Sequence, residues 1–101
     1  MALSRVYQPM AGSGQTGLAV TNGAVVSLTV PGKAKQAKVF VKAAQLNWFS
    51  DARTPTTTAT GNGEYAFGND QILLENPNEL RGFRCIAATA TNCTLDVTYF
   101  A

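Results

Sequence analysis

The stretch that decides the fold of this chain reads Thr94-Leu95-Asp96-Val97-Thr98-Tyr99-Phe100. Successive side chains of a β-strand point to opposite faces of the sheet, so every second residue shares a face. Leu95, Val97 and Tyr99 share one face of such a strand. Asp96 and Thr98 share the other. The pattern predicts a strand whose apolar face packs into the core and whose polar face points away from it.

Short runs rich in β-branched and aromatic residues recur along the rest of the chain, between clusters of Gly, Pro and Asn. No stretch shows the apolar periodicity of an amphipathic helix. We expect about nine strands, at residues 3–8, 18–21, 24–30, 37–44, 46–49, 64–67, 71–75, 83–88 and 94–100. The sequence therefore predicts an all-β fold: an antiparallel two-sheet sandwich, jelly-roll or Greek-key like, with about eight or nine short strands.

Two Asn-Gly pairs predict tight turns. Asn22-Gly23 separates the runs at residues 18–21 and 24–30, and Asn-Gly favours the type I′ hairpin turn, which needs positive φ at both central residues. We expect a hairpin there and a second one at Asn62-Gly63. The runs at 83–88 and 94–100 are expected to pair as a further hairpin across residues 89–93.

One helical turn is expected after residues 71–75. Asn76 suits the N-cap, Pro77 suits the first helical position, and Gly82 marks the end. We expect Leu80 to plug one end of the sandwich.

The composition fits one small domain with a weakly charged surface. The chain has 101 residues, of which 46% are hydrophobic and only 14% are charged, whereas typical soluble proteins have about 25% charged residues. A formal charge of +2 does not support nucleic-acid binding, which needs a concentrated basic face. No apolar run reaches the ~18 residues of a membrane helix. We expect a soluble protein that packs against other proteins.

The first seven residues lack the continuous apolar core of a secretion signal, so we expect synthesis in the cytosol. Conditions there favour free thiols at Cys85 and Cys93. In the expected hairpin Cys93 lies at the turn and Cys85 lies well inside its strand, which is too far apart for a disulfide.

Residues 1–17 are predicted to form a flexible N-terminal arm, and residues 18–101 are predicted to form the sandwich domain. Pro9 and the glycines of the arm deny it regular structure. Tyr7 and Met10 are apolar enough to dock on a partner, which would order the arm. The series Gly12-Ser13-Gly14-Gln15-Thr16-Gly17 matches a nucleotide-binding pattern, but a strand-like run follows where a helix is required. We interpret it as a connector.

Residues for catalysis are missing. The chain has no histidine, and two cysteines cannot complete a four-ligand zinc site. Glu64 with Asp70, and Glu75 with Glu79, have the composition of glycosidase carboxylate pairs. Each pair lies at a strand end or turn, where acids normally face water. We therefore expect no enzymatic activity, no cofactor and no metal.

The contact surface is expected around a Thr-rich loop at residues 54–63, which contains no charge and no large apolar group. A long connection in a small domain is usually functional or disordered. Aromatic and Arg side chains are typical interface anchors. We predict contact with a protein partner through Phe49, Arg53, Thr54, Thr56, Thr57, Thr58 and Thr60.

Trp48 has two interpretations. Alternation places Leu46 and Trp48 on one face and Phe49 on the other, which favours Trp48 in the core. Trp48, Phe49 and Arg53 could instead form a platform that stacks against sugars.

Several features follow one another in the C-terminal half: a strand with Asn47-Trp48, a Pro/Thr/Gly loop through Ala59-Thr60-Gly61, the turn Leu74-Glu75-Asn76-Pro77, the strand Gly82-Phe83-Arg84-Cys85-Ile86-Ala87-Ala88 and the closing strand at 95–100. In this order they resemble small virion proteins of tailed bacteriophages. The resemblance implies a structural role, in a β-sandwich subunit that decorates or cements the capsid or forms part of a tail or fibre.

On this resemblance we expect a decoration or cement protein on the capsid surface of the virion, made in the host cytoplasm, whose partner is the major capsid protein. The alternative is a receptor- or carbohydrate-binding module of a tail or head fibre that contacts host glycans. A homotrimer is favoured, because so small a sandwich buries only ~65% of its unfolded surface and phage heads offer three-fold positions.

Overall fold

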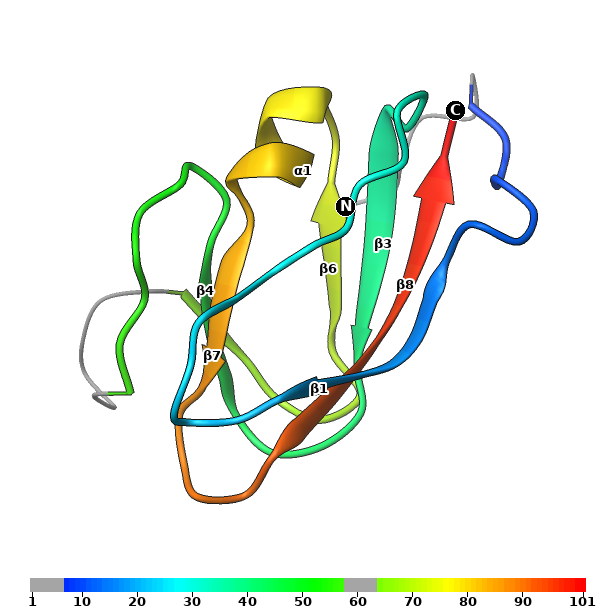
Figure 1. The fold of residues 1–101 in the computed structure, drawn as a ribbon. Helices are drawn as coiled ribbons and strands as arrows, with labels where there is room; N and C mark the ends of the chain where they lie inside the picture. Colours follow the sequence, from blue (N-terminus) through cyan, green and yellow to red (C-terminus); the bar gives the residue numbers. More distant parts are fainter. Residues whose placement is uncertain (1–6, 58–63) are drawn as a thin grey trace.

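Two four-stranded antiparallel sheets pack face to face in the computed structural model, which describes residues 7–57 and 64–101 (Figure 1). Sheet A has the strand order β1-β8-β3-β6, and sheet B has the order β2-β7-β4-β5. The elements are β1 (Gln15–Val20), β2 (Val26–Ser27), β3 (Gln36–Val41), β4 (Leu46–Phe49), β5 (Glu64–Ala66), β6 (Gln71–Leu74), α1 (Pro77–Gly82), β7 (Arg84–Ala87) and β8 (Cys93–Phe100). The predicted all-β sandwich is confirmed, with eight strands in the described part of the chain.

β8 lies inside sheet A, between β1 and β3. Leu95 and Tyr99 are fully buried and Val97 is 3% exposed. Asp96 and Thr98 alternate with them and are half-buried on the opposite face. The alternation predicted for this strand is therefore confirmed.

The inward faces of both sheets share one apolar core. β3 contributes alternate residues, Ala37, Val39 and Val41, all of them fully buried. Residues from both sheets, from α1 and from the connections join them in this core: Val20, Ala34, Leu46, Ala66, Ile72, Leu74, Leu80, Phe83, Cys85, Ala87, Cys93, Leu95, Val97 and Tyr99. Removal of this apolar surface from water is the main force that holds the two sheets together.

The hairpin predicted at Asn22-Gly23 does not form. β1 pairs with β8 in sheet A, whereas β2 pairs with β7 in sheet B, so the turn carries the chain from one sheet to the other. Neither Asn22 nor Gly23 has a positive φ, which a type I′ turn requires. The Gly23 N–H instead donates to Thr21 Oγ1 (3.2 Å). The second predicted turn, Asn62-Gly63, lies outside the described residues.

The hairpin predicted across residues 89–93 is also wrong, because β7 belongs to sheet B and β8 to sheet A. Cys93 is therefore not at a hairpin turn. It is the first residue of β8 and is fully buried, as is Cys85 on β7. Both cysteines are free thiols, as expected, although the predicted geometry behind that expectation was incorrect.

The segment before β1 lies along the end of β8. Gln8 and Ala101 exchange backbone hydrogen bonds of 3.0 and 2.9 Å, and the Met10 N–H donates to the Tyr99 carbonyl (2.8 Å). A Cβ added to Gly14 would lie 2.6 Å from the Val97 carbonyl oxygen, so only glycine fits there. The boundary expected between residues 17 and 18 falls inside β1. The flexibility of the arm in solution stays a prediction.

α1 forms where it was expected. Asn76 is its N-cap, and its Oδ1 accepts from the Glu79 N–H (2.9 Å). Pro77 occupies the first turn, Leu80 is 1% exposed within the core, and Gly82 is the last helical residue. The helix therefore closes one end of the sandwich, between β6 and β7 (Figure 1).

Candidate functional site

Residues 50–57 follow β4 and are fastened to the outer face of sheet B. Asn47 points outward from β4, yet it is only 1% exposed. Its Nδ2 donates to the Thr56 carbonyl oxygen (2.7 Å), which ties the far part of this segment back to the strand. Pro55, between these anchor points in sequence, is also fully buried. This part of the loop is therefore a fixed surface.

A second attachment joins the start of the same segment to the end of α1. The Ala52 N–H donates to the Gly82 carbonyl oxygen (2.9 Å), and Ala52 itself has φ 69°. A Cβ on Gly82 would lie 2.7 Å from the Ser50 carbonyl oxygen and 3.0 Å from the Ala52 nitrogen. Glycine at position 82 thus allows the loop backbone to approach the helix.

Arg53 lies over the ring of Phe49 between these two attachments. Its Cζ is 4.0 Å from the ring centroid, and its Nε lies 2.8 Å from Asp51 Oδ2 and 3.0 Å from Oδ1. The hydrogen bond from Arg53 lowers the pKa of the Asp51 carboxyl below its usual value. Arg53 remains 66% exposed and Asp51 55% exposed. The result is a solvent-facing Arg–Phe stack whose guanidinium is already oriented.

Trp48 points the other way from Phe49. It lies on the inward face of β4, opposite Cys85, and its ring centroid is 5.8 Å from that of Phe83. It is half-buried and packs against the core. The core interpretation of Trp48 agrees with this geometry, because Trp48 and Phe49 do not form one continuous ring surface.

The predicted contact residues fall into two separate groups. Phe49, Arg53, Thr54, Thr56 and Thr57 come together at the end of β4, with Thr54 and Thr57 exposed. Tyr7 and Met10 lie near the end of β8, on the opposite side of the molecule (Figure 1), and Met10 packs partly into the core. Thr58 and Thr60 lie outside the described residues.

A groove that the sequence did not predict opens between β5 and β6. Its volume is about 440 Å³, and it is lined by Trp48, Tyr65, Ala66, Asp70, Gln71, Ile72 and Leu73. Tyr65 is 45% exposed, and Phe67 in the following turn is 55% exposed. Aromatic residues in a short strand and in the turn after it, here Tyr65 and Phe67, are a weak sequence signal. The groove depends on β5 and β6 both lying at sheet edges.

The remaining reactive groups are structural. Burial raises the pKa of the Cys85 thiol to about 12, so it stays protonated and is a poor nucleophile. Burial also raises the pKa of Tyr99, to about 12, and its hydroxyl donates to Gln15 Oε1 (2.6 Å). No group of three or more His, Cys, Asp or Glu residues that could hold a metal ion occurs among residues 7–57 and 64–101. Within the same residues, no helix has the length and apolar character needed to cross a membrane.

Comparisons of the chain with protein-family models, with curated proteins and with solved structures found no match.

Proposed function

We propose that this chain is a non-enzymatic structural protein of a tailed-phage virion, which decorates the head and binds the major capsid protein. The observation that carries the proposal is the exposed stack of Arg53 on Phe49, oriented by Asp51. Arg and aromatic side chains are enriched among residues that dominate binding energy. Because the stack is already ordered, a partner loses little free energy in fixing it.

The attachment of the loop supports a protein contact in particular. Residues 50–57 are held at Asn47 and at Gly82, and Thr54 and Thr57 beside the stack carry no charge. A low-charge, pre-ordered surface desolvates at low cost and suits a broad protein interface. The carbohydrate-binding alternative needs an exposed aromatic platform, and Trp48 faces away from Phe49. We therefore favour the capsid.

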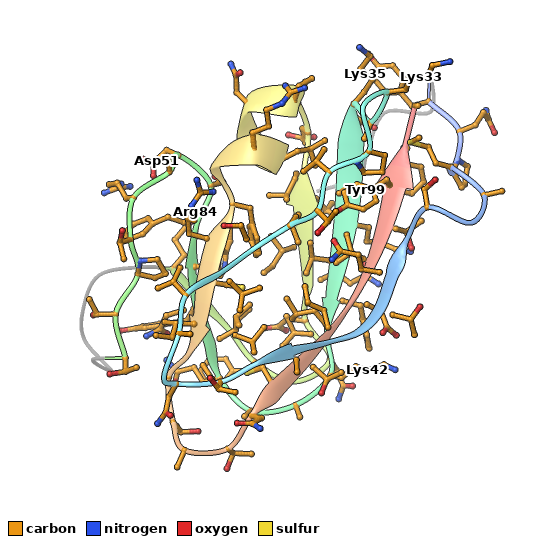
Figure 2. All side chains as sticks on the ribbon, in the orientation of Figure 1. Lys33, Lys35, Lys42, Asp51, Arg84 and Tyr99 are labelled. Carbon is orange, nitrogen blue, oxygen red and sulfur yellow. The ribbon has the colours of Figure 1, made fainter. Side chains whose placement is uncertain are left out.

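The test uses the double variant Phe49→Ala, Arg53→Ala. Its matched control is Lys33→Ala, Lys35→Ala, which removes two exposed side chains at the far end of the molecule (Figure 2). Circular dichroism first establishes that both variants fold. Binding to expanded empty heads of the phage that encodes the chain is then measured by co-sedimentation, and binding to host cells by flow cytometry.

Loss of two anchors that each contribute about 2 kcal/mol weakens binding to heads by at least about a hundredfold. The lysine control binds heads as the unaltered protein does. Loss of binding to cells alone would support the receptor alternative. Unchanged binding to both would show that the contact surface lies elsewhere.

The homotrimer is part of the same proposal. A sandwich of this size gains stability from association, and the low overall charge does not oppose it. Static light scattering at micromolar concentration measures the oligomeric state. A protein that is a monomer in solution and binds heads as single copies would contradict the trimer.

A further inference from the structure

β6 is an edge strand of sheet A. It pairs with β3 on one side, and no described strand pairs with it on the other. An unoccupied edge presents backbone donors and acceptors to another strand. The groove between β5 and β6 runs along this edge, since Gln71, Ile72 and Leu73 line it.

The register shows which backbone groups face the groove side. Val41 and Asp70 are joined by a hydrogen bond from the Val41 N–H to the Asp70 carbonyl (2.9 Å), and Val39 lies opposite Ile72. Hydrogen-bonded pairs alternate with non-bonded pairs in an antiparallel ladder. The pairs of Phe40 with Gln71 and of Lys38 with Leu73 are therefore the non-bonded ones. The N–H and C=O groups of Gln71 and Leu73 point away from β3, toward the open edge.

The groove offers an apolar floor beside these backbone groups. Trp48, Ala66 and Ile72 contribute apolar groups to its lining, and Asp70 and Gln71 contribute polar groups. An added strand would direct alternate side chains into this floor and the others to the outer face of sheet A. A segment with small or medium apolar residues at every second position fits this pattern.

Charge selects the occupant. Gln71–Leu74 is uncharged, but Asp70 precedes it and Glu75 follows it, and both acids are exposed. Antiparallel pairing of two copies of β6 would bring the Asp70 and Glu75 carboxylates of both copies together along one short edge. Like charges within about 10 Å of one another repel, and this repulsion opposes such a pair. A segment with Lys or Arg at its two ends is instead complementary.

We infer that the edge of β6 accepts an extended segment of a partner protein as an added strand of sheet A, with Lys or Arg flanking alternating apolar residues. The backbone groups of Gln71 and Leu73 form the new ladder, and the apolar side chains fill the groove over Trp48. This mode of recognition takes affinity from main-chain hydrogen bonds and specificity from side-chain pockets. The inference rests on the proposed function for the identity of the partner, the major capsid protein.

The probe for the test is the synthetic peptide Lys-Thr-Val-Thr-Val-Thr-Lys, with Glu-Thr-Val-Thr-Val-Thr-Glu as its charge-reversed control. Amide hydrogen exchange, measured by NMR on the full chain, should show new protection at Gln71 and Leu73 when the lysine peptide is added. Leu73→Pro removes one outward N–H, and Leu73→Ala is its matched control because it shortens the side chain and keeps the donor. Loss of that hydrogen bond should weaken the peptide's affinity about tenfold relative to Leu73→Ala.

Each outcome decides between occupants. Protection by the lysine peptide, with weaker protection by the glutamate peptide, supports the inference. Equal protection by both peptides would overturn the role of charge. Protection that rises with protein concentration in the absence of peptide would assign the edge to a second copy. If no peptide protects Gln71 or Leu73, and Leu73→Pro and Leu73→Ala bind heads equally, the added strand is overturned. If Leu73→Pro does not fold, the exchange measurement on the unaltered protein alone decides whether the strand is added.

The same measurements separate this inference from the proposed function. The Phe49→Ala, Arg53→Ala variant should bind the lysine peptide with unchanged affinity, because neither Phe49 nor Arg53 lines the groove. Peptide binding without binding to heads would refute the capsid partner and leave the added strand standing. If the protein binds heads, Leu73→Pro does not change that binding and no peptide binds, the added strand is refuted and the capsid partner stands.

Discussion

β8 and β4 are both inner strands of their sheets, but their outer faces have different surroundings. On β8, the outward residues Asp96 and Thr98 are half-buried and the inward ones are buried. On β4, the outward Asn47 is 1% exposed, almost as buried as its inward neighbour Leu46 at 0%. The difference shows that the alternation of apolar and polar residues identifies the inward face of a strand. It identifies a solvent-exposed face only where no other segment covers the sheet.

Residues 50–57 cover the outer face of β4 and present a backbone carbonyl to it. This explains why the polar residue Asn47 lies beneath them. Asn47 is 1% exposed, and its Nδ2 donates to the Thr56 carbonyl oxygen. An apolar residue at position 47 would bury more apolar surface, yet it would remove this hydrogen bond. The outer face of sheet B is therefore part of the site, whereas the outer face of sheet A around β8 meets solvent.

The largest expected effect comes from placing a carboxylate on the inward face of β8, compared with the same change on its outward face. Val97→Asp should abolish folding, since an unpaired buried charge costs several kcal/mol against a total stability of about 5–15 kcal/mol. Thr98→Asp should change the free energy of unfolding by about 0.5 kcal/mol or less, because Thr98 is on the outer face opposite Lys38. Circular dichroism and urea denaturation compare the two variants. Equal tolerance of both would contradict the assignment of faces.

The alternation in β8 and the capping sequence at Asn76 were predictable because each depends on neighbours in sequence. The partners of β1 and β2 were not, since the Asn22-Gly23 signal assumes that both flanking runs join one sheet, and packing of distant strands decides that. In the same way, the cluster of Phe49 with Arg53 was predictable from proximity along the chain. The attachment of residues 50–57 to Gly82 depends on a contact across about 30 residues. The groove beside β6 depends on which strands lie at the sheet edges. No local sequence pattern encodes either feature.

A smaller effect should come from the contact that holds the cover of sheet B. Gly82→Ala places a Cβ 2.7 Å from the Ser50 carbonyl oxygen, so the loop backbone must shift, at a cost of about 1–3 kcal/mol. Gly32→Ala is the matched control, because nothing lies within 4 Å of the added Cβ and its φ is not positive. Thermal denaturation measures both. If Gly82→Ala were as well tolerated as Gly32→Ala, the close approach of the loop to α1 would not constrain the site.

The smallest effect concerns the solvent face of β8, where Asp96 Oδ2 lies 2.9 Å from Lys42 Nζ and Oδ1 accepts from the Gly17 N–H (2.9 Å). The hydrogen bond from Lys42, followed by that from Gly17, lowers the pKa of Asp96 below its usual value in the folded state. A carboxyl whose pKa falls on folding stabilises the fold above its unfolded pKa, and this contribution is lost as the pH falls through the lower folded value. Asp96→Asn retains an oxygen that can accept from Gly17 and removes the charge. We expect its melting temperature to lie slightly below that of the unaltered protein at about pH 7, and the difference to shrink as the pH falls through the acid range in which Asp96 is protonated. A difference that stays constant over this range would show that Asp96 acts through packing, and would remove the electrostatic distinction between the exposed face of β8 and the covered face of β4.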